Sequence, residues 1–527
     1  MEVDVLIVGA GPTGLMLANQ LARQGLRPTI IDRHAGPSRE TRALGVQART
    51  LEIYAQLGLV DRALALGRQG AGANLWAQGR RLARVPLGDA GRHLTPYPYI
   101  LVLGQDDNER ILGDRLREQG VAVQWNCELV GLEQSRDHVV ATLAGADGRT
   151  RALRAAWVAG CDGARSAVRE RCGIGFPGAP YEHVFFVADV EMTGTMVADE
   201  VNVHLWKEGF HLLVPMRGEQ HWRIVGIVPP PLRRDDVRFE EMLPSIREAL
   251  GTIHVRTCSW FSTYRIHHRA AERFRDGRCF LLGDAAHIHS PVGAQGMNTG
   301  LQDASNLAWK LALVAQGQAE ATLLDSYEAE RLPVARRLLA TTDRAFRFIV
   351  SDGRLSGLLR TRVLARLAAL AMQRSGIQAA AFRTVSQIAI AYRDSVLSVT
   401  RPGWPADAPQ AGDRFPWLRL QLQPDGPVTD LFECLADPRF TLFVIGDMRG
   451  GRPADHMSDA DLKKLVRAQR VPATPGNAET LSRLGVTMPA FFLVRPDGYI
   501  GLCGDTLDGS ALQTYLAEHL QCLPRAA

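Results

Sequence analysis

The sequence lacks the features that mark several large classes of protein. No run approaches the roughly 18 unbroken apolar residues that a membrane span requires, because Lys310 interrupts the promising stretch over residues 307–314. Met1 and Glu2 lead directly into an apolar segment at residues 3–8, without the charged leader of a secretory signal peptide. Internal repeats and low-complexity tracts are absent as well. We therefore expect a globular, cytoplasmic protein without membrane contact.

Cysteine pairs and excess charge are scarce too. The eight cysteines are scattered along 527 residues with no CxxC spacing, so neither a disulfide framework nor a zinc site is expected. His267, His268, His287 and His289 lie close in sequence, but no set of thiolates or carboxylates accompanies them, and we predict no metal. The net charge of +5 is slight for 61 basic and 56 acidic side chains, which argues against nucleic acid as a partner.

What the chain does contain is a pattern of mixed α/β structure. A strand at 3–8, a helix at 13–24 and a strand at 29–32 form a predicted βαβ unit. Apolar segments at 157–161 and 279–282 predict further strands that are buried in a parallel sheet. Between these two segments the residues alternate between apolar and polar, as in an antiparallel sheet with one face against a core. The alternating segments are 184–191, 201–206, 211–215 and 221–228.

Helices dominate from residue 297 to about residue 400, and a stretch rich in Pro, Gly and Asp at 401–412 is typical of a linker. Beyond it, a smaller α/β pattern has strands at 441–445, 490–494 and 499–502, helices at 459–468 and 510–520, and a hairpin turn at Asp497-Gly498. We therefore predict an α/β protein in which an antiparallel sheet domain is inserted into a Rossmann-like nucleotide-binding domain. The predicted parts are 1–175 and 278–400 for the nucleotide-binding domain with its helical segment, 176–277 for the sheet domain, and 401–527 for the C-terminal domain.

A glycine-rich turn, Gly9-x-Gly11-x-x-Gly14, follows the first predicted strand and opens the first helix. Gly9 permits the tight turn, Gly11 lets the backbone approach a pyrophosphate, and Gly14 lets helix and strand pack closely. The N-terminus of the helix adds N–H donors and the positive end of a dipole. Asp32, at the end of the second strand, is placed to bond ribose hydroxyls. The motif predicts dinucleotide binding without distinguishing NAD from FAD.

A second motif, Gly283-Asp284-Ala285-Ala286-His287, ends the strand at 279–282, and a loop at 291–298 then leads into a long helix. A carboxylate just past a strand end can accept hydrogen bonds from a polyol such as the ribityl chain of a flavin. The many small residues in the loop indicate backbone in close contact with a ligand. Backbone N–H groups at a helix start also favour the negative charge of a reduced flavin ring. This motif favours FAD over NAD.

A third motif, Asp162-Gly163-Ala164-Arg165-Ser166, follows the strand at 157–161 and continues to Arg169. By itself it indicates a capped helix start. In this order and at these separations, however, the three motifs resemble the single-component FAD-dependent aromatic hydroxylases (class A flavoprotein monooxygenases) with the p-hydroxybenzoate hydroxylase fold. Residues 264–269 and 303–311 also resemble the phenol hydroxylase and polyketide hydroxylase branch of that family. The resemblance covers residues 1 to about 400.

The resemblance implies a non-covalently bound FAD and NAD(P)H that docks transiently as the reductant. Reduced flavin would react with O2, and the resulting flavin C4a-hydroperoxide would hydroxylate a phenolic or polycyclic, polyketide-like aromatic substrate. The cofactor would supply this chemistry, and the protein would supply orientation and a dry pocket. Two alternatives stay open. One is Baeyer–Villiger insertion next to the ketone of a related polycycle, and the other is a flavin-binding scaffold or sensor without turnover.

Carried over position by position, the resemblance assigns contacts with FAD. The pyrophosphate would lie at the glycines of the first motif and the adenosine ribose at Asp32. Arg42 would lie near the flavin and Gln105 near its ribityl chain, and Asp284 would lie near the ribityl chain or the pyrophosphate. Asp162-Gly163 would belong to an element shared by FAD and nicotinamide binding, and the loop at 291–298 would line the isoalloxazine ring. The expected FAD-binding residues are Gly9, Gly11, Thr13, Gly14, Asp32, Arg33, Arg42, Gln105, Asp162, Gly163, Asp284, Pro291, Gly293, Gly296, Met297 and Asn298.

No side chain is assigned to take the proton from a phenol. One phenol-hydroxylating branch has a histidine shortly after the arginine that Arg42 matches, but here residues 42–47 contain no such base. This departure favours a larger, already acidic polyphenol or polyketide as the substrate. The candidates for a catalytic role are Arg42 and Pro291, together with four residues of the predicted sheet domain, His204, His211, Arg217 and Tyr264.

The C-terminal part, 401–527, resembles the thioredoxin-like domain found in the same branch. Met488-Pro489 matches the position of a cis-proline in that domain. The segment Gly446-Asp447-Met448-Arg449 contains no cysteine where disulfide exchange would need a thiolate. The resemblance thus implies a domain for packing or for forming a homodimer. Removing it after about residue 407 would be expected to spare flavin reduction.

Overall fold

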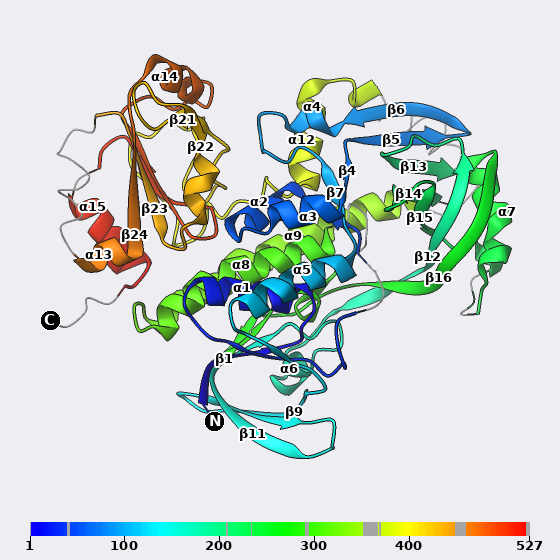
Figure 1. The fold of residues 1–527 in the computed structure, drawn as a ribbon, viewed down its shortest axis with the longest axis horizontal. Coiled ribbons are helices and arrows are strands. Elements are labelled where there is room, and N and C mark those ends of the chain that lie inside the picture. The colour runs from blue at the N-terminus through cyan, green and yellow to red at the C-terminus, as the bar shows by residue number, and fades with distance from the viewer. Residues whose placement is uncertain are drawn as a thin grey trace.

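The computed structural model describes residues 2–38, 43–206, 209–232, 234, 236–289, 295–350, 367, 370–447, 460–507 and 509–522. Figure 1 shows a central part of sheet and helices, a large sheet at one end of the molecule, and a smaller α/β part at the other end. Within those ranges, every helix is too short or too polar to span a bilayer.

The central part is built on a sheet with the strand order β17-β18-β11-β1-β2-β8. Its strands from β18 to β8 run parallel, and the hairpin of β9 and β10 continues β11 in antiparallel pairing. Residues 5–8 of β1 are buried, as the continuous apolar run predicts for a strand covered on both faces. The strands are β1 (Glu2–Val8), β2 (Thr29–Ile31), β8 (Val123–Gln124), β9 (Glu128–Gln134), β10 (Val139–Ala144), β11 (Thr150–Gly160), β17 (Arg275–Asp276) and β18 (Cys279–Leu281).

Helix α1 packs on β1 and contacts both α5 and α8, whereas α4 contacts α12 and the strands β5 and β6 of the second sheet. Pro12 suits the first position of α1 because the N–H that proline lacks would have no partner within the helix there. Leu15, Leu17 and Leu21 of α1 are buried in the largest apolar cluster of the described chain. The helices are α1 (Pro12–Arg23), α2 (Ala48–Gln56), α3 (Val60–Leu66), α4 (Leu87–Gly91), α5 (Gln105–Glu118), α6 (Ala167–Arg171), α8 (Gly296–Ala315), α9 (Asp325–Val350) and α12 (Ser375–Val385), with a small sheet of β3 (Gly45–Val46), β7 (Ile100–Val102) and β4 (Arg68–Gly70).

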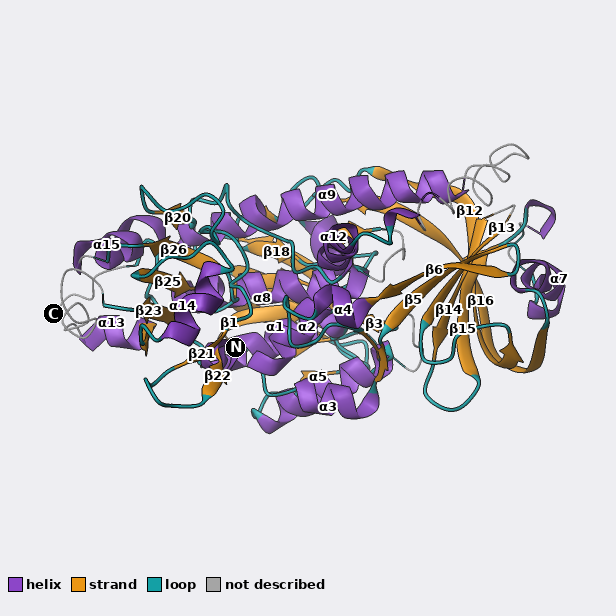
Figure 2. Ribbon diagram, turned by 90° about the horizontal axis from the view of Figure 1, so that it is seen from above, coloured by secondary structure: helices purple, strands orange, loops and turns teal. Residues whose placement is uncertain are grey.

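The second sheet has the order β19-β16-β12-β15-β14-β13-β5-β6. The predicted sheet domain, 176–277, supplies only its middle, because β5 and β6 come from the N-terminal part and β5 pairs in parallel with β13. Helix α7 (Phe239–Leu250) covers one face, and Figure 2 shows it on the side of the sheet that faces away from α8. The strands are β5 (Gly72–Ala77), β6 (Arg80–Pro86), β12 (Gly178–Gly194), β13 (Val201–Trp206), β14 (Gly209–Pro215), β15 (His221–Ile227), β16 (Ile253–Ala270) and β19 (His287–Ile288).

The C-terminal part has a sheet with the order β20-β26-β25-β23-β24, in which β23 and β24 are parallel and β25 and β26 form an antiparallel hairpin. The peptide bond between Met488 and Pro489, just before β25, is cis. The predicted helix at 459–468 is wrong in its second half, because α13 ends at Leu465 and β24 follows directly. Val466 and Val471 are buried at the two ends of β24, where pairing with β23 overrides the helical pattern. The elements are β20 (Val399–Thr400), β21 (Arg419–Gln421), β22 (Val428–Asp430), β23 (Phe440–Ile445), β24 (Val466–Val471), β25 (Ala490–Val494), β26 (Ile500–Gly504), α13 (Ala460–Leu465), α14 (Pro475–Ser482) and α15 (Gly509–Thr514).

The stretch 401–412, predicted as a linker, is packed onto the C-terminal sheet. Trp404 is buried in its core, and Gly412 N donates to Ile500 O (2.7 Å). A second apolar core is shared with the central part, because Trp309 of α8 packs against Phe440 of β23. The C-terminal part is therefore continuous in its packing with the helices of the central part.

Candidate functional site

The three sequence motifs and Asp32 follow four neighbouring parallel strands. The strand register pairs Val8 of β1 with Ile31 of β2 and with Gly160 of β11, and pairs Gly160 with Leu281 of β18. The turns after these strands therefore leave the sheet side by side. Ligands of open parallel sheets bind at this edge, outside the carboxyl ends of the strands. The fold thus brings together motifs that lie far apart in the sequence.

The glycines of the first motif are required for two different reasons. Gly9 has a φ of 101°, and a Cβ there would lie 2.4 Å from the carbonyl oxygen of Cys161. A Cβ at Gly14 would lie 1.9 Å from the carbonyl oxygen of Gly9. At Gly11, in contrast, no atom lies within 4 Å of the Cβ position. Packing within the protein explains Gly9 and Gly14 but not Gly11, which fits close approach of a ligand.

Thr13 joins the first motif to the second. A Cβ at Gly283 would lie 2.6 Å from Thr13 Oγ1, and one at Gly300 of α8 would lie 2.4 Å from the same atom. The N-terminus of α1 therefore packs directly on the turn after β18 and on α8. Asp284 is exposed, although its neighbours from Cys279 to Gly283 and at 285–287 are buried. Its carboxylate is the acidic group that this strand end presents outside the core.

Asp303 on α8 supports the second motif from within the core. Its carboxylate accepts hydrogen bonds from Gly283 N (3.0 Å) and Arg331 Nε (2.6 Å), and lies 2.7 Å from His287 Nε2. Although burial opposes ionisation, Arg331 and His287 hold the pKa of Asp303 below its usual range. The position of Gly283 is thus fixed by a buried carboxylate. This role was missed from sequence, although Asp303 belongs to the helix segment that carried part of the resemblance.

The third motif forms a capped helix start that also contacts the second motif. Asp162 accepts hydrogen bonds from Ser166 Oγ (2.6 Å) and Val168 N (3.2 Å), and burial raises the pKa of its carboxyl. Gly163 follows with a φ of 77°. Arg169 donates to the carbonyl oxygen of Ala285 in the second motif (2.9 Å). Arg169 is therefore a link between two turns at the same sheet edge.

At the end of β2, Asp32 accepts hydrogen bonds from Ala10 N (2.7 Å) in the first motif and His34 N (2.8 Å). A second carboxylate, missed from sequence, lies nearby on α5. Glu109 is buried and accepts from Gln105 Nε2 (2.9 Å) and Ser38 N (2.9 Å). Burial raises the pKa of Glu109, and Asp32 raises it further. Its spacing of one helical turn from Gln105 is the signal that could have identified it.

The loop expected to line a flavin ring is described from residue 295 onwards, at the start of α8. The side chain of Asn298 is buried and connects α8 to the beginning of α2, through Gln47 N (2.9 Å), Thr50 Oγ1 (2.7 Å) and Gly45 O (2.8 Å). Gly296 and Met297 precede it in the same helical turn. Arg42, Pro291 and Gly293 lie outside the described residues.

Tyr264 lies on the face of the second sheet that is opposite to α7. It packs with Phe185 (ring centroids 5.9 Å apart), Phe210 and Ile227 in a small apolar cluster. Burial raises the pKa of Tyr264 to about 12, so its hydroxyl keeps its proton near neutral pH. On the same face, Arg223 and Asp189 form a bidentate ion pair with both distances 2.6 Å.

His211 and His204 lie on the other face. They are paired across β13 and β14, and stack on Trp206 (5.3 Å) and Trp76 (5.2 Å), respectively. Neighbours alternate between the two faces of a strand, so His211 is separated from the cluster that contains Phe210 and Tyr264. Burial lowers the pKa of His204 to about 4 and that of His211 to about 3. Their position removes both histidines as groups that could take a proton from a molecule next to Tyr264.

In the part of the chain that the structure describes, no group of three or more His, Cys, Asp or Glu side chains is arranged to hold a metal ion. His287 is instead engaged with Asp303 and stacks on His289, with ring centroids 6.3 Å apart.

Several known proteins are similar to this chain. The family described as FAD binding domain matches residues 2–342. The chain is 35% identical to a 6-methylpretetramide 4-monooxygenase from Streptomyces rimosus, over 99% of this chain and 94% of that protein. Its structure is similar to that of an anhydrotetracycline hydroxylase from Streptomyces rimosus (31% identity, TM-score 0.78, 100% of both chains). It is also similar to an aklavinone-11 hydroxylase solved with FAD and aklavinone (28% identity, TM-score 0.77, 98% of this chain and 99% of that one).

Proposed function

The chain belongs to the FAD binding domain family and is a FAD-dependent aromatic monooxygenase, and from this premise we propose that its substrate is a polycyclic, polyketide-like phenol. The observation that carries this proposal is the character of the sheet face around Tyr264. That face combines aromatic and aliphatic side chains with a protonated hydroxyl, while the neighbouring histidines lie on the opposite face. A polycyclic phenol that ionises by itself needs no side-chain base. The Baeyer–Villiger alternative is not favoured, because the relatives are aromatic hydroxylases.

The residues at the sheet edge fit FAD, and we propose that they hold it along its length. The pyrophosphate would lie at Gly11, where the N-terminal end of α1 favours negative charge. Asp32, Arg33 and Glu109 would bind the adenosine ribose. Gln105, Asp162-Gly163 and Asp284 would contact the ribityl chain or the pyrophosphate, and residues 296–298 the isoalloxazine ring. Arg42, Pro291 and Gly293 remain part of this proposal from the sequence.

When bound and reduced by NAD(P)H, FAD would activate O2, which supplies the oxygen atom for hydroxylation. The protein's own contribution is to hold the substrate and exclude water. Phe185 and Phe210 offer aromatic contact with a flat ring system. The hydroxyl of Tyr264 donates a hydrogen bond to an oxygen of the substrate, which favours the phenolate form. The ion pair of Arg223 and Asp189 adds no net charge to this face.

We further propose that residues 401–527 form a thioredoxin-like domain without redox activity. Support comes from the mixed sheet with the order β20-β26-β25-β23-β24 and from the absence of any cysteine between Cys434 and Cys503 in the sequence. Formation of a homodimer through this domain and a cytoplasmic location remain predictions from the sequence.

The test is a comparison of ring substrates with the FAD-loaded protein. Polycyclic phenols should accelerate NAD(P)H oxidation and gain one oxygen atom, as measured by mass spectrometry, whereas single-ring phenols of similar acidity should do so weakly. If single-ring phenols are hydroxylated as fast, the proposed substrate class is wrong. Hydroxylation and Baeyer–Villiger insertion both add one oxygen atom, so mass alone does not separate them. A polycyclic ketone without a phenol therefore serves as the control for Baeyer–Villiger insertion.

A further inference from the structure

The hairpin turn between β25 and β26 lies against two helices of the FAD-binding part. The carbonyl oxygen of Asp497 accepts a hydrogen bond from Arg49 in the first turn of α2. Its carboxylate accepts hydrogen bonds from two residues of α8, Trp309 Nε1 (3.1 Å) and Asn306 Nδ2 (3.5 Å). Gly498 follows with a φ of 81°, and a Cβ there would lie 3.0 Å from Arg49 Nη2. This turn therefore contacts α2 and α8 at the same time, and Gly498 lets the guanidinium group approach.

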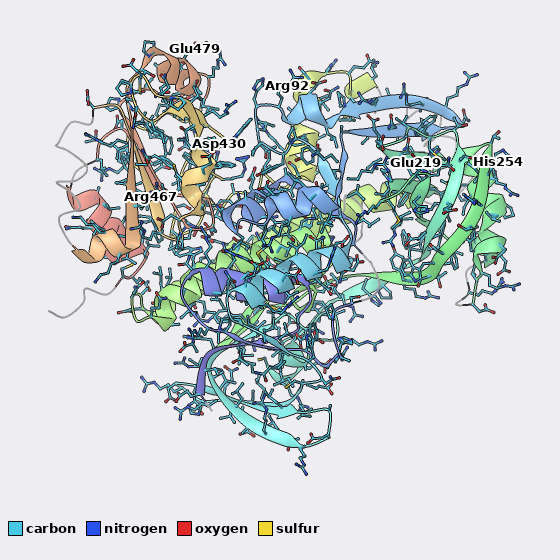
Figure 3. All side chains as sticks on the ribbon, viewed as in Figure 1. Arg92, Glu219, His254, Asp430, Arg467 and Glu479 are labelled. Atoms are coloured by element: carbon cyan, nitrogen blue, oxygen red, sulfur yellow. The ribbon has the colours of Figure 1, made fainter. Side chains whose placement is uncertain are left out.

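The charges in this contact are completely buried. Arg495 donates to Glu330 of α9 (2.7 and 2.9 Å) and to Asp497 (2.6 and 3.1 Å), and Lys310 of α8 donates to Glu330 (2.8 Å). Each of these four side chains is at most 2% exposed, and two positive charges balance two negative ones. Removing one partner of such a set leaves an uncompensated buried charge, which is strongly destabilising. Because breaking any of these buried ion pairs is unfavourable, they hold the hairpin against α8 and α9. Glu479, which is labelled in Figure 3, lies instead at the outer surface.

Helices α2 and α8, which both contact the hairpin turn, are also joined to each other at their N-terminal ends. Asn298 in the first turn of α8 accepts hydrogen bonds from Gln47 N and Thr50 Oγ1. Arg49 and Thr50 are consecutive residues in the first turn of α2. Arg49 binds Asp497 of the hairpin, and Thr50 binds Asn298 of α8. A shift of the hairpin would thus be passed to the segments at which α2 and α8 begin.

We propose that Arg495 and Asp497 are positioning residues for the flavin. Through Arg49 and Trp309 they fix α2 and α8, and with them residues 43–47 and 295–298. This inference rests on the proposed contacts between the start of α8 and the isoalloxazine ring. It gives the C-terminal domain a role in the flavin site that goes beyond packing or dimer formation.

Two substitutions test this role, one in α2 and one in α8. Arg49→Gln removes the bond to Asp497 and the contact of the guanidinium with the Tyr499 ring (5.1 Å). Glu52, which also binds Arg49, keeps Arg414 (3.2 Å) and Thr95 (2.8 Å). Trp309→Phe removes the donor to Asp497 from α8 and retains an aromatic ring against Phe440. For each variant we expect the Kd for FAD to rise between about twofold and about thirtyfold, the range of coupling through such networks. The visible circular dichroism of the bound flavin should change as well.

Arg23→Gln is the matched control at the same interface. Arg23 donates from the last turn of α1 to the carbonyl oxygens of Leu435, Ala436 and Asp437 (2.8 to 3.0 Å). We expect this variant to lose thermal stability but to keep the wild-type FAD affinity and spectrum. The inference is overturned if Arg49→Gln and Trp309→Phe match the wild type, or if Arg23→Gln alters the flavin equally. A wild-type protein that binds no FAD would instead refute the proposed flavin site.

Discussion

The buried histidine pair of the second sheet makes the protein sensitive to acid. The pKa of His204 is lowered from its ordinary 6.5 to about 4, and that of His211 to about 3, chiefly because burial disfavours the charged ring. Consider a group whose pKa is lower in the folded state than in the unfolded state. At a pH between these two pKa values, the group is protonated in the unfolded state but not in the folded state, and proton binding therefore favours unfolding. For these histidines the stability is fully present above about pH 6.5 and is lost as the pH falls toward 4 and 3.

The size of the effect follows from the pKa values. At pH 5, about 1.5 pH units below the ordinary pKa, protonation of each histidine in the unfolded state lowers the free energy of unfolding by about 2 kcal/mol. Both together would cost about 4 kcal/mol, a large part of the roughly 5–15 kcal/mol that stabilises a typical domain. Neither ring has a hydrogen-bond partner among the described residues that would retain the proton.

The assay is urea unfolding at pH 7 and at pH 5, followed by tryptophan fluorescence, because Trp76 and Trp206 stack on the two rings. The double variant His204→Leu, His211→Leu should lose less stability between the two pH values than the wild type, by about 4 kcal/mol. His254→Gln, at the exposed end of β16, is the control and should behave as the wild type. Equal pH dependence in the double variant and the wild type would refute the reasoning.

Three further predictions concern the flavin, the substrate and the C-terminal domain. Asp284→Ala should purify with little FAD but unchanged folding, since this carboxylate is exposed; a wild-type flavin absorbance after gel filtration would contradict the assignment. Tyr264→Phe should raise the KM for the phenolic substrate by about twofold to tenfold, the value of one neutral hydrogen bond, and an unchanged KM in steady-state assays would exclude this contact. Truncation after Asp407 should give a misfolded or FAD-free protein, because it removes Arg495 and exposes Trp309. A truncated protein that still folds and reduces its flavin would restore the expectation drawn from sequence.

Much of the site was predictable because its motifs are local. The conformation of Gly9 and the close packing at Gly14 follow from a strand–turn–helix pattern that is visible in a few consecutive residues. The same holds for the buried strands that end at Gly160 and Leu281, whose apolar runs fit a parallel sheet. A motif at the end of each strand then suffices to place all of them at one edge.

The rest depended on pairings between distant residues, which leave no local pattern. Nothing near β5 indicates that it joins β13, and nothing near Glu330 indicates that its partner is Arg495. The packed stretch around Trp404 has the composition of a linker, and its burial comes from a sheet formed by later residues. For the same reason, the role proposed for the C-terminal hairpin rests on contacts of Asp497 with α2 and α8, which are distant from it in the sequence.

A crystal structure of the protein with FAD tests the central claim most directly, namely that the turn at Gly11 and the segment from Gly283 to Asn298 bind one and the same cofactor. The account predicts a single FAD per chain, with its pyrophosphate against the N-terminus of α1 and its ring next to the first turn of α8. Flavin bound elsewhere, or with only its adenine half in contact with this sheet edge, would contradict it.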